Sequence, residues 1–539
     1  GVQADIGIRG GSFEQTLVMV NGIKVNDPQT GHHNLNVPFN ILDIDQAEIV
    51  KGPGARLYGQ NAFSGAVNFI TRVRESRGVR AQLFGGGFGL RGGSLSLSIP
   101  AGAYRQSLAF SGSRSDGYRE NTDFSILNAL YTSSVRAGRG DLNFLGGYVS
   151  RKFGANGFYA NPSFTRQYEA VETAMAGVGY SLQTKNFTWH PRVYFRINTD
   201  DYLFIREDPS VYKNLHTTHV AGAELNSSWK TRLGTTGMGF EYRLESIRGT
   251  WVRSGIETKS NLDGFSRNHI GLFLEHRFVF GRLDLTPGVY SGYYSDFGIK
   301  TFPGIDAGFS FGRNFRVYAN FGQSFRIPSF YDQHYDSPVE KGDPELDPES
   351  STGFEAGLKF QTGSISSEFN IFRQNSSNLI DWVRVPLSDS TYYWQARNIT
   401  EIARTGVEFG MKFVPRTSRS MPDKSWLPTI GFTYNYLISD LADNGIISRY
   451  ILENLKHQLI MGIEHRIAWK IFHHMNIRYN VRESEPEYWV IDSRIFWRHK
   501  EIPLIFVEAT NLTDTRYTEV MTPMPGRWFR CGIQYNFGF

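Results

Sequence analysis

Residues 17–72 read LVMVNGIKVNDPQTGHHNLNVPFNILDIDQAEIVKGPGARLYGQNAFSGAVNFITR. The stretch opens with a short apolar run at 17–20, followed by Asn21-Gly22. This dipeptide is typical of a two-residue hairpin turn, because both turn positions need a positive φ. The pattern predicts a compact α+β module with one polar tip and no catalytic centre. Its further elements are a strand at 23–25, a polar loop at 26–36, an acidic-apolar segment at 41–50, a Gly/Pro loop at 51–59 and an apolar run at 66–71.

Beyond residue 73, apolar and polar residues alternate along many short runs. Phe315, Val317 and Ala319, for example, are separated by Arg316 and Tyr318. A period of two is the mark of a strand whose two faces differ. The apolar face would point inward in a soluble sheet and toward lipid in a membrane barrel, so alternation alone leaves both open.

Three features favour the membrane barrel. Aromatic residues make up 14% of the chain, and many stand near strand ends, as an interfacial girdle requires. No long strand is apolar on both faces, and the chain ends on an aromatic, Phe539, which resembles the C-terminal signature of outer-membrane barrels. No apolar run is long enough for a transmembrane helix.

Several functional classes find no support in the sequence. The single cysteine, Cys531, excludes an internal disulfide and a cysteine-based zinc site. Basic and acidic residues are interspersed and the net charge is only +5, so nucleic acid is not an expected partner. No HExxH or GxxxxGK[ST] motif occurs, and we therefore expect no enzyme.

Three groups of motifs resemble one known family. Glu48, Gly52-Pro53, 57–59 (LYG) and 65–71 (GAVNFIT) are similar to the end of the plug domain of TonB-dependent outer-membrane receptors. The stretches 325–328 (FRIP) and 342–349 (GDPELDPE) are similar to a pair of boxes in the barrel of that family, with Asp343 and Glu345 in place of the commoner asparagines. Asn511, Asp514, Tyr517 and 525–527 (PGR) resemble its ending.

The resemblance implies the fold. We expect an all-β transmembrane barrel of 22 antiparallel strands over residues 73–539, with a small N-terminal α+β plug domain over residues 1–72 filling its lumen, in the bacterial outer membrane. Roughly 21 residues per strand and connection suit such a barrel. The chain opens mid-plug at Gly1 without a recognisable signal peptide or Ton box, so we expect a mature or trimmed piece.

The resemblance also implies interior contacts and partners. Arg326 and Glu349 are expected at the wall facing the plug, although simple strand termination explains them equally well. The plug surface is expected to be polar, as Lys51, Arg56 and Asn68 suggest. Expected partners are TonB with ExbB–ExbD, outer-membrane lipid and lipopolysaccharide, and a surface lipoprotein that captures ligand.

The most similar subclass is the cobalamin receptors, above all the Bacteroidetes type. The loop DPQTGHHN at 27–34 and the segments 154–169 and 207–219 carry this resemblance, and NLIDWV at 378–383 resembles the enterobacterial cobalamin receptor. A corrin ring needs polar groups that recognise amides, together with aromatic walls. The candidate ligand-binding residues are Asp27, Gln29, Thr30, His32, His33 and Asn34 on the plug tip, with Phe158, Tyr159, Tyr331 and Tyr335 above them.

Two other ligands stay open. Haem could be ligated by His32 or His33 together with His334, since imidazole is a natural axial ligand. A ferric siderophore is the second alternative. No resident cofactor or metal is expected. Four acids could bind Ca²⁺ in the extracellular loops, but a solvated acidic loop is the preferred interpretation: Asp200, Asp201, Glu207 and Asp208.

Overall fold

The structure is a computed structural model. It describes residues 2–71, 73, 76–158, 163–388, 392–399, 401–415, 426–441, 447–449, 455–483, 485–499, 503–519 and 522–538. The expected boundary residue Arg72, the candidate ligand residue Tyr159 and the terminal Phe539 lie outside these residues. No helix of the described part is long and apolar enough to cross a bilayer.

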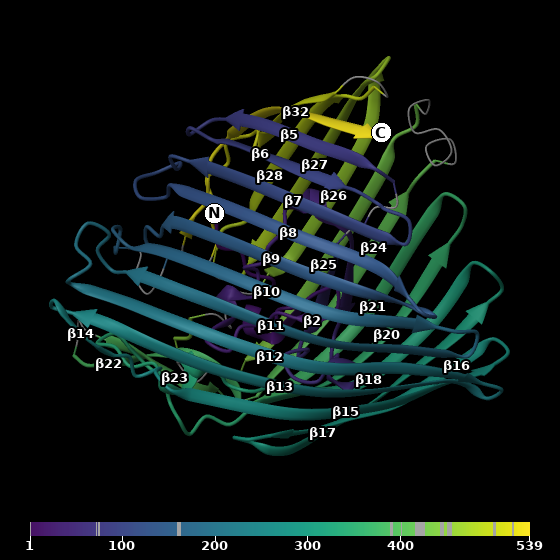
Figure 1. The fold of residues 1–539 in the computed structure, drawn as a ribbon, viewed down its shortest axis with the longest axis horizontal. Helices are drawn as coiled ribbons and strands as arrows, with labels where there is room; N and C mark the ends of the chain where they lie inside the picture. The colour runs from purple at the N-terminus through teal and green to yellow at the C-terminus, as the bar shows by residue number, and fades with distance from the viewer. Residues whose placement is uncertain are drawn as a thin grey trace.

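The N-terminal residues form a four-stranded sheet inside the barrel, seen in purple in Figure 1. Its order is β2-β1-β4-β3, with β1 and β4 parallel and the other pairs antiparallel. Asn21 and Gly22 have φ of 50° and 77°, so the expected hairpin turn is present. The elements are η1 (Phe13–Gln15), β1 (Thr16–Val20), β2 (Ile23–Lys24), η2 (Gly31–His33), η3 (Ile41–Asp43), β3 (Ile44–Lys51), α1 (Ala55–Tyr58) and β4 (Gly65–Thr71). The segment 51–59, expected as a loop, thus contains the one-turn helix α1.

Around this sheet, 22 antiparallel strands of the described residues close into a barrel, and the last pairs with the first (Figure 1). The expected strand number is confirmed. The strands are β5 (Gly78–Gly86), β6 (Arg91–Ser98), β7 (Tyr104–Ser115), β8 (Phe124–Ala137), β9 (Gly140–Gly154), β10 (Tyr168–Gln183), β11 (Phe187–Leu203), β12 (Tyr212–Thr231), β13 (Gly234–Arg253), β15 (Phe265–Phe280), β16 (Leu283–Tyr294), β17 (Gly298–Phe311), β18 (Phe315–Arg326), β20 (Glu349–Gln361), β21 (Ile365–Ser377), β24 (Ile402–Phe413), β25 (Thr429–Leu441), β26 (Leu455–Ala468), β27 (Ile471–Arg482), β28 (Tyr488–Trp497), β29 (Leu504–Thr510) and β32 (Trp528–Gly538).

The two ends of the barrel differ. At one end the strands are joined by tight turns, such as 138–139 and 232–233. At the other, the connections 327–348 and 378–401 carry structure of their own, and the labels β14, β22 and β23 gather there in Figure 1. Short periplasmic turns and long outer loops are the rule in such barrels, so the long connections mark the outer end. Their elements are β14 (Ile256–Lys259), α2 (Phe330–His334), β19 (Glu340–Lys341), β22 (Leu379–Pro386) and β23 (Tyr392–Ile399), with β30 (Thr518–Glu519) and β31 (Thr522–Pro523) in the last connection.

The barrel strands carry apolar residues outward and polar ones inward. On β13, Phe240, Tyr242 and Leu244 are each about two-fifths exposed, whereas Glu241 and Arg243 between them are buried against the plug. This reverses the arrangement of a soluble protein and provides an apolar band for lipid.

The plug contacts the wall through both ion pairs and apolar packing. Lys51 lies 3.1 Å from Glu408 and Arg56 2.5 Å from Asp306, in line with a polar plug surface. Asn68, however, bonds within the plug, to Glu48 and the Gly22 N–H. The expectation of a wholly polar surface is wrong on one side, because an apolar cluster excludes water there. It joins plug residues Val18, Val20, Ile23, Val25, Val37 and Phe39 to wall residues Ala109, Leu130, Leu145, Met175, Tyr194 and Val220.

Candidate ligand-binding site

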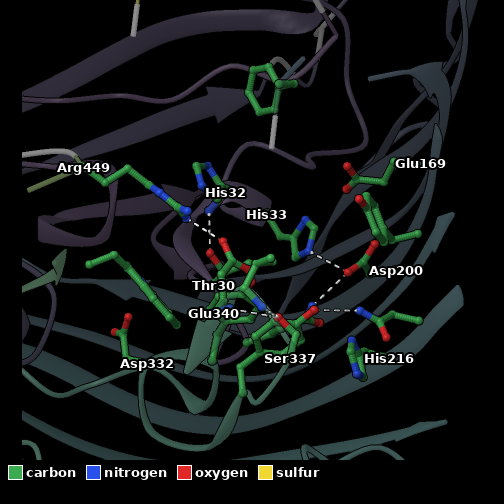
Figure 2. Close-up of a pocket in the computed structure, with 18 of the residues that line it drawn as sticks. Thr30, His32, His33, Glu169, Asp200, His216, Asp332, Ser337, Glu340 and Arg449 are labelled. Carbon is green, nitrogen blue, oxygen red and sulfur yellow. Dashed lines mark hydrogen bonds and ion pairs between the residues drawn. The ribbon is translucent and has the colours of Figure 1, made fainter. Parts of the chain in front are cut away.

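A cavity of about 450 Å³ lies between the plug tip and the outer ends of β10, β11 and β12. The connection between β18 and β20, which contains α2, closes its opposite side. Figure 2 shows residues of both sides facing this space. Plug residues and the outer parts of the barrel therefore form one site at the outer end.

Seven of the eleven predicted ligand-binding residues line this cavity: Gln29, Thr30, His32, His33, Phe158, Tyr331 and Tyr335. Asp27 and Asn34 do not, because they are buried beneath it and hold the loop. Asp27 forms an ion pair with Arg196 of β11 and accepts a hydrogen bond from Thr218, while the Asn34 side chain accepts one from the Asp27 N–H at 2.9 Å. Tyr159 lies outside the described residues.

His334, the last residue of α2, lies away from the cavity lining. Its ring stacks on Phe265, with the centroids 3.7 Å apart. It therefore does not face His32 and His33 across the cavity. The two axial ligands that a haem site would need are not brought together.

His33 is among the most enclosed of the plug-tip residues, at 3% exposure. It sits in the 3-10 helix η2, which begins after Thr30, whose hydroxyl accepts from the His32 N–H. Its Nε2 lies 3.6 Å from Oδ2 of Asp200, which is an ion-pair distance rather than a hydrogen bond. Burial lowers the pKa of His33, but Asp200, with smaller effects of Asp27 and Glu169, outweighs it and raises the pKa to about 9. The imidazolium is thus favoured at neutral pH.

Aromatic rings form the wall opposite the plug. Tyr331 and Tyr335 stack with centroids 4.1 Å apart, and Trp382 of β22 lies 5.3 Å from Tyr331. The Tyr331 hydroxyl donates to Glu340 at 2.5 Å, and Arg449 lies 2.7 Å from the same carboxylate. Such a wall offers flat apolar surface with charged groups at its edge.

Three amide oxygens of the cavity lining have no hydrogen-bond partner within the described residues. They belong to Gln29 on the plug, Gln167 before β10 and Asn214 on β12. Their amide nitrogens are engaged, donating to Asp200, the Tyr202 hydroxyl and the Tyr335 hydroxyl. A buried acceptor without a partner costs about 1–3 kcal/mol. Each of these three residues therefore offers an unused acceptor next to the cavity.

Arg326 joins the cavity floor to the wall, as expected for a residue facing the plug. Its guanidinium lies 3.0 Å from Glu349 and 3.0 Å from Asp332 of α2, and 3.7 Å from Glu14 of the plug. Gln15 of the plug donates to Glu349 at 2.9 Å. Arg326 and Glu349 thus connect the barrel wall to the plug, in addition to their positions at the ends of strands.

The four acids considered for Ca²⁺ do not come together. Asp201 pairs with Lys213 at 3.0 Å and Glu207 with Arg166 at 2.7 Å. Asp208 accepts from Ser210, and Asp200 turns inward to the plug tip. Asp200 and Asp201 are consecutive strand residues and point to opposite faces, so these four acids do not form one Ca²⁺ site.

Sequence reasoning missed most of the wall side of the cavity. Most of these residues stand near the outer ends of barrel strands, where alternation identifies lumen-facing positions only once the strand ends are known, and Trp382 and Arg449 stand in long connections. The missed residues are Gln167, Glu169, Tyr202, Tyr212, Asn214, His216, Trp382 and Arg449.

Two family models match the chain. One, described as TonB-dependent Receptor Plug Domain, matches residues 1–66, and the other, described as TonB dependent receptor-like, beta-barrel, matches residues 62–512. The second match alone spans more than half of the chain. The chain belongs to the TonB-dependent receptor family. This membership confirms the predicted receptor, its outer-membrane location and the expectation that it is not an enzyme.

Individual relatives of this receptor agree with the family. Vitamin B12 transporter BtuB of Vibrio vulnificus (strain CMCP6) is 23% identical over 420 residues, which cover 74% of this chain and 64% of the relative. The chain thus spans slightly less than two thirds of that relative. Vitamin B12 transporter BtuB of Vibrio cholerae serotype O1 is 24% identical over 100% of this chain and 86% of its own length. Both are Vibrio proteins, so the similarity is not specific to the Bacteroidetes type.

Among solved structures, the siderophore receptor PirA from Pseudomonas aeruginosa has the same fold. Its TM-score is 0.77 at 18% identity, and the match covers 99% of this chain and 93% of PirA. At this identity the likeness concerns the fold alone.

Proposed function

We propose that this receptor imports cobalamin or a related corrinoid across the outer membrane. The observation that carries the proposal is the set of unpartnered amide oxygens of Gln29, Gln167 and Asn214 beside a wall of aromatic rings. The amide side chains at the edge of a corrin can donate to these oxygens, and the ring system can lie against Tyr331 and Trp382. The named function of the two Vibrio relatives supports the same ligand class.

The transport cycle follows from the family. TonB with ExbB–ExbD would couple the proton motive force to a rearrangement of the plug, which we place at residues 1–72. Outer-membrane lipid and lipopolysaccharide surround the barrel in this proposal, and a surface lipoprotein would hand over the ligand. Ligand binding and energised release are separate steps, so binding is testable on the purified chain.

Tryptophan fluorescence provides the test, because Trp382 lines the cavity. Cyanocobalamin, haemin and a ferric siderophore are titrated separately into the detergent-solubilised protein. We expect saturable quenching by cyanocobalamin and none by the siderophore. Cobalamin that leaves the fluorescence unchanged, with haemin or the siderophore binding instead, would contradict the proposal.

A single variant locates the binding site. Gln167→Met keeps the length of the side chain but removes the acceptor, and we expect it to weaken cyanocobalamin binding by about 1–3 kcal/mol, which is roughly 5- to 150-fold in Kd. The matched control is Gln458→Met on β26, whose amide donates to Asn480 away from the cavity lining. Equal affinities of the two variants would place the ligand elsewhere.

A further inference from the structure

Three metal-ligating side chains from three different elements meet at the floor of the cavity. They are His33 of the plug tip, Glu169 of β10 and Asp200 of β11, and all three are buried. One ligand atom from each lies within 4.8 Å of the other two. Figure 2 shows His33 directed at Asp200, with Glu169 beside them.

Two atoms of this group lack a hydrogen bond inside the described part of the chain. One is Nε2 of His33, on a side chain that is 3% exposed, and the other is Oδ1 of Asp200. His33 Nε2 has only the 3.6 Å ion pair with Asp200 Oδ2, and a buried carboxylate oxygen without a hydrogen bond costs free energy. A cation between them would satisfy both.

We propose that His33, Glu169 and Asp200 bind a divalent transition-metal ion. Four-coordinate Zn²⁺ with bonds of about 2.0–2.2 Å places its ligand atoms about 3.4 Å apart. The 3.6 Å between His33 Nε2 and Asp200 Oδ2 is close to this spacing. An imidazole among the ligands selects zinc, cobalt, nickel or copper over calcium and magnesium.

Neighbouring groups are placed to orient the ligands. The Asn36 side-chain nitrogen lies 3.2 Å from Nδ1 of His33. If the amide is flipped, its oxygen accepts a hydrogen bond from Nδ1–H, and the metal ion takes the place of the proton on Nε2. Gln29 donates to Asp200 Oδ2 at 2.8 Å and fixes the second ligand.

The ion site goes beyond corrinoid import and stands without it. The competing interpretation is that the three groups only tie the plug to the wall through the His33–Asp200 ion pair. The two interpretations differ in one measurable property, which is the affinity of the intact protein for a metal ion.

The test is isothermal titration of ZnCl₂ into the chelator-treated, detergent-solubilised protein. We expect a single ion per chain, and we expect His33→Gln, Glu169→Gln and Asp200→Asn each to weaken binding by on the order of 100-fold or more. The matched control is Glu340→Gln, since Glu340 is a buried carboxylate of the same cavity. This variant should bind zinc like the parent protein. Heat-dependent gel migration verifies that each variant is folded.

The parent protein also gives a readout that needs no variant. Cu²⁺ bound at this site should show nitrogen hyperfine coupling in its electron paramagnetic resonance spectrum, as one imidazole requires. Absence of zinc binding, an all-oxygen copper spectrum, or unchanged affinity in folded His33→Gln would each overturn the ion site. Cobalamin titration of the same chelator-treated sample decides the proposed function separately.

Discussion

At the scale of single residues, Arg326 links three parts of the molecule. Its side chain is 2% exposed and contacts carboxylates of the plug, of α2 and of β20. Glu349 also accepts from the Ile380 N–H at the start of β22. Buried charges of this kind are tolerated because each has a partner, and the loss of one leaves the others uncompensated.

Replacing this arginine should therefore be costly. We expect Arg326→Met to lower the free energy of unfolding by about 3–5 kcal/mol, because Glu349 and Asp332 stay buried without a cation. The midpoint of heat-dependent gel migration in detergent measures the effect. Arg166→Met is the control, since Arg166 and Glu207 are both more than half exposed and such pairs contribute at most about 1 kcal/mol. A midpoint as high in Arg326→Met as in the control would contradict the expectation.

Glu14 gives the molecule a pH dependence near neutrality. Burial raises the pKa of Glu14 from 4.5 to about 7, and the opposing effect of Arg326 is smaller. An acid whose pKa is higher in the folded than in the unfolded state destabilises the fold as it ionises. The parent protein should therefore lose stability between pH 4.5 and about 7 relative to Glu14→Gln. Melting curves at pH 5 and pH 8 test this, and a difference in midpoint that does not grow with pH would refute it.

At the scale of elements, the β1–β2 hairpin shows how a local signal meets a tertiary contact. The turn residue Gly22 has φ of +77°, and a Cβ there would lie 2.3 Å from Arg192 Nη1. Arg192 of β11 donates to the Asn21 carbonyl at 3.1 Å, so the turn is also a docking point on the wall. The positive φ of Gly22 and the short distance to Arg192 both require glycine at this position.

A pair of glycine variants separates these two requirements. Gly22→Ala should lower stability by more than about 1 kcal/mol, since it adds backbone strain and displaces Arg192. Gly102→Ala, in the turn between β6 and β7, has φ of +62° but open space around the new Cβ, so it should suffer the strain alone. Melting midpoints compare them. If both variants lose the same stability, the contact with Arg192 contributes nothing.

At the scale of the whole molecule, ion pairs hold the plug to the barrel wall, and two of them involve Arg9. Arg9 precedes β1, and its side chain is 3% exposed. It lies 2.8 Å from Glu355 and 2.9 Å from Glu408 on the barrel wall. In the proposed transport cycle, a force that pulls on the N-terminal segment would act on the Arg9 ion pairs at an early step.

Removal of both carboxylate charges should loosen that segment. We expect the double variant Glu355→Gln, Glu408→Gln to be cleaved faster by protease within residues 2–15, while the barrel itself remains folded, because Arg9 loses both ionic partners. Limited proteolysis followed by mass spectrometry measures the rate. The control is Glu368→Gln on the same wall, since the ion pair of Glu368 is with Lys359 and not with Arg9. Cleavage at the parent rate would show that other contacts hold the segment.

The sequence by itself determined the barrel, the plug and the family. These signals are local, because each is read from residues that are close together in the sequence. They are the period-two alternation, the Asn21-Gly22 turn and the ordered motifs at 48–71 and 325–349. Four plug-tip residues predicted from the sequence also line the cavity: Gln29, Thr30, His32 and His33.

Only the tertiary structure decided what stands opposite the plug tip. Strand pairing sets Ala170 against Asp201 and Thr199 against Thr217, and this register brings Glu169 and Asp200 to His33, more than a hundred residues earlier in the chain. A shift of one residue would turn these side chains to the lipid face. The register depends on hydrogen bonds between distant strands, and no local pattern in either strand encodes it.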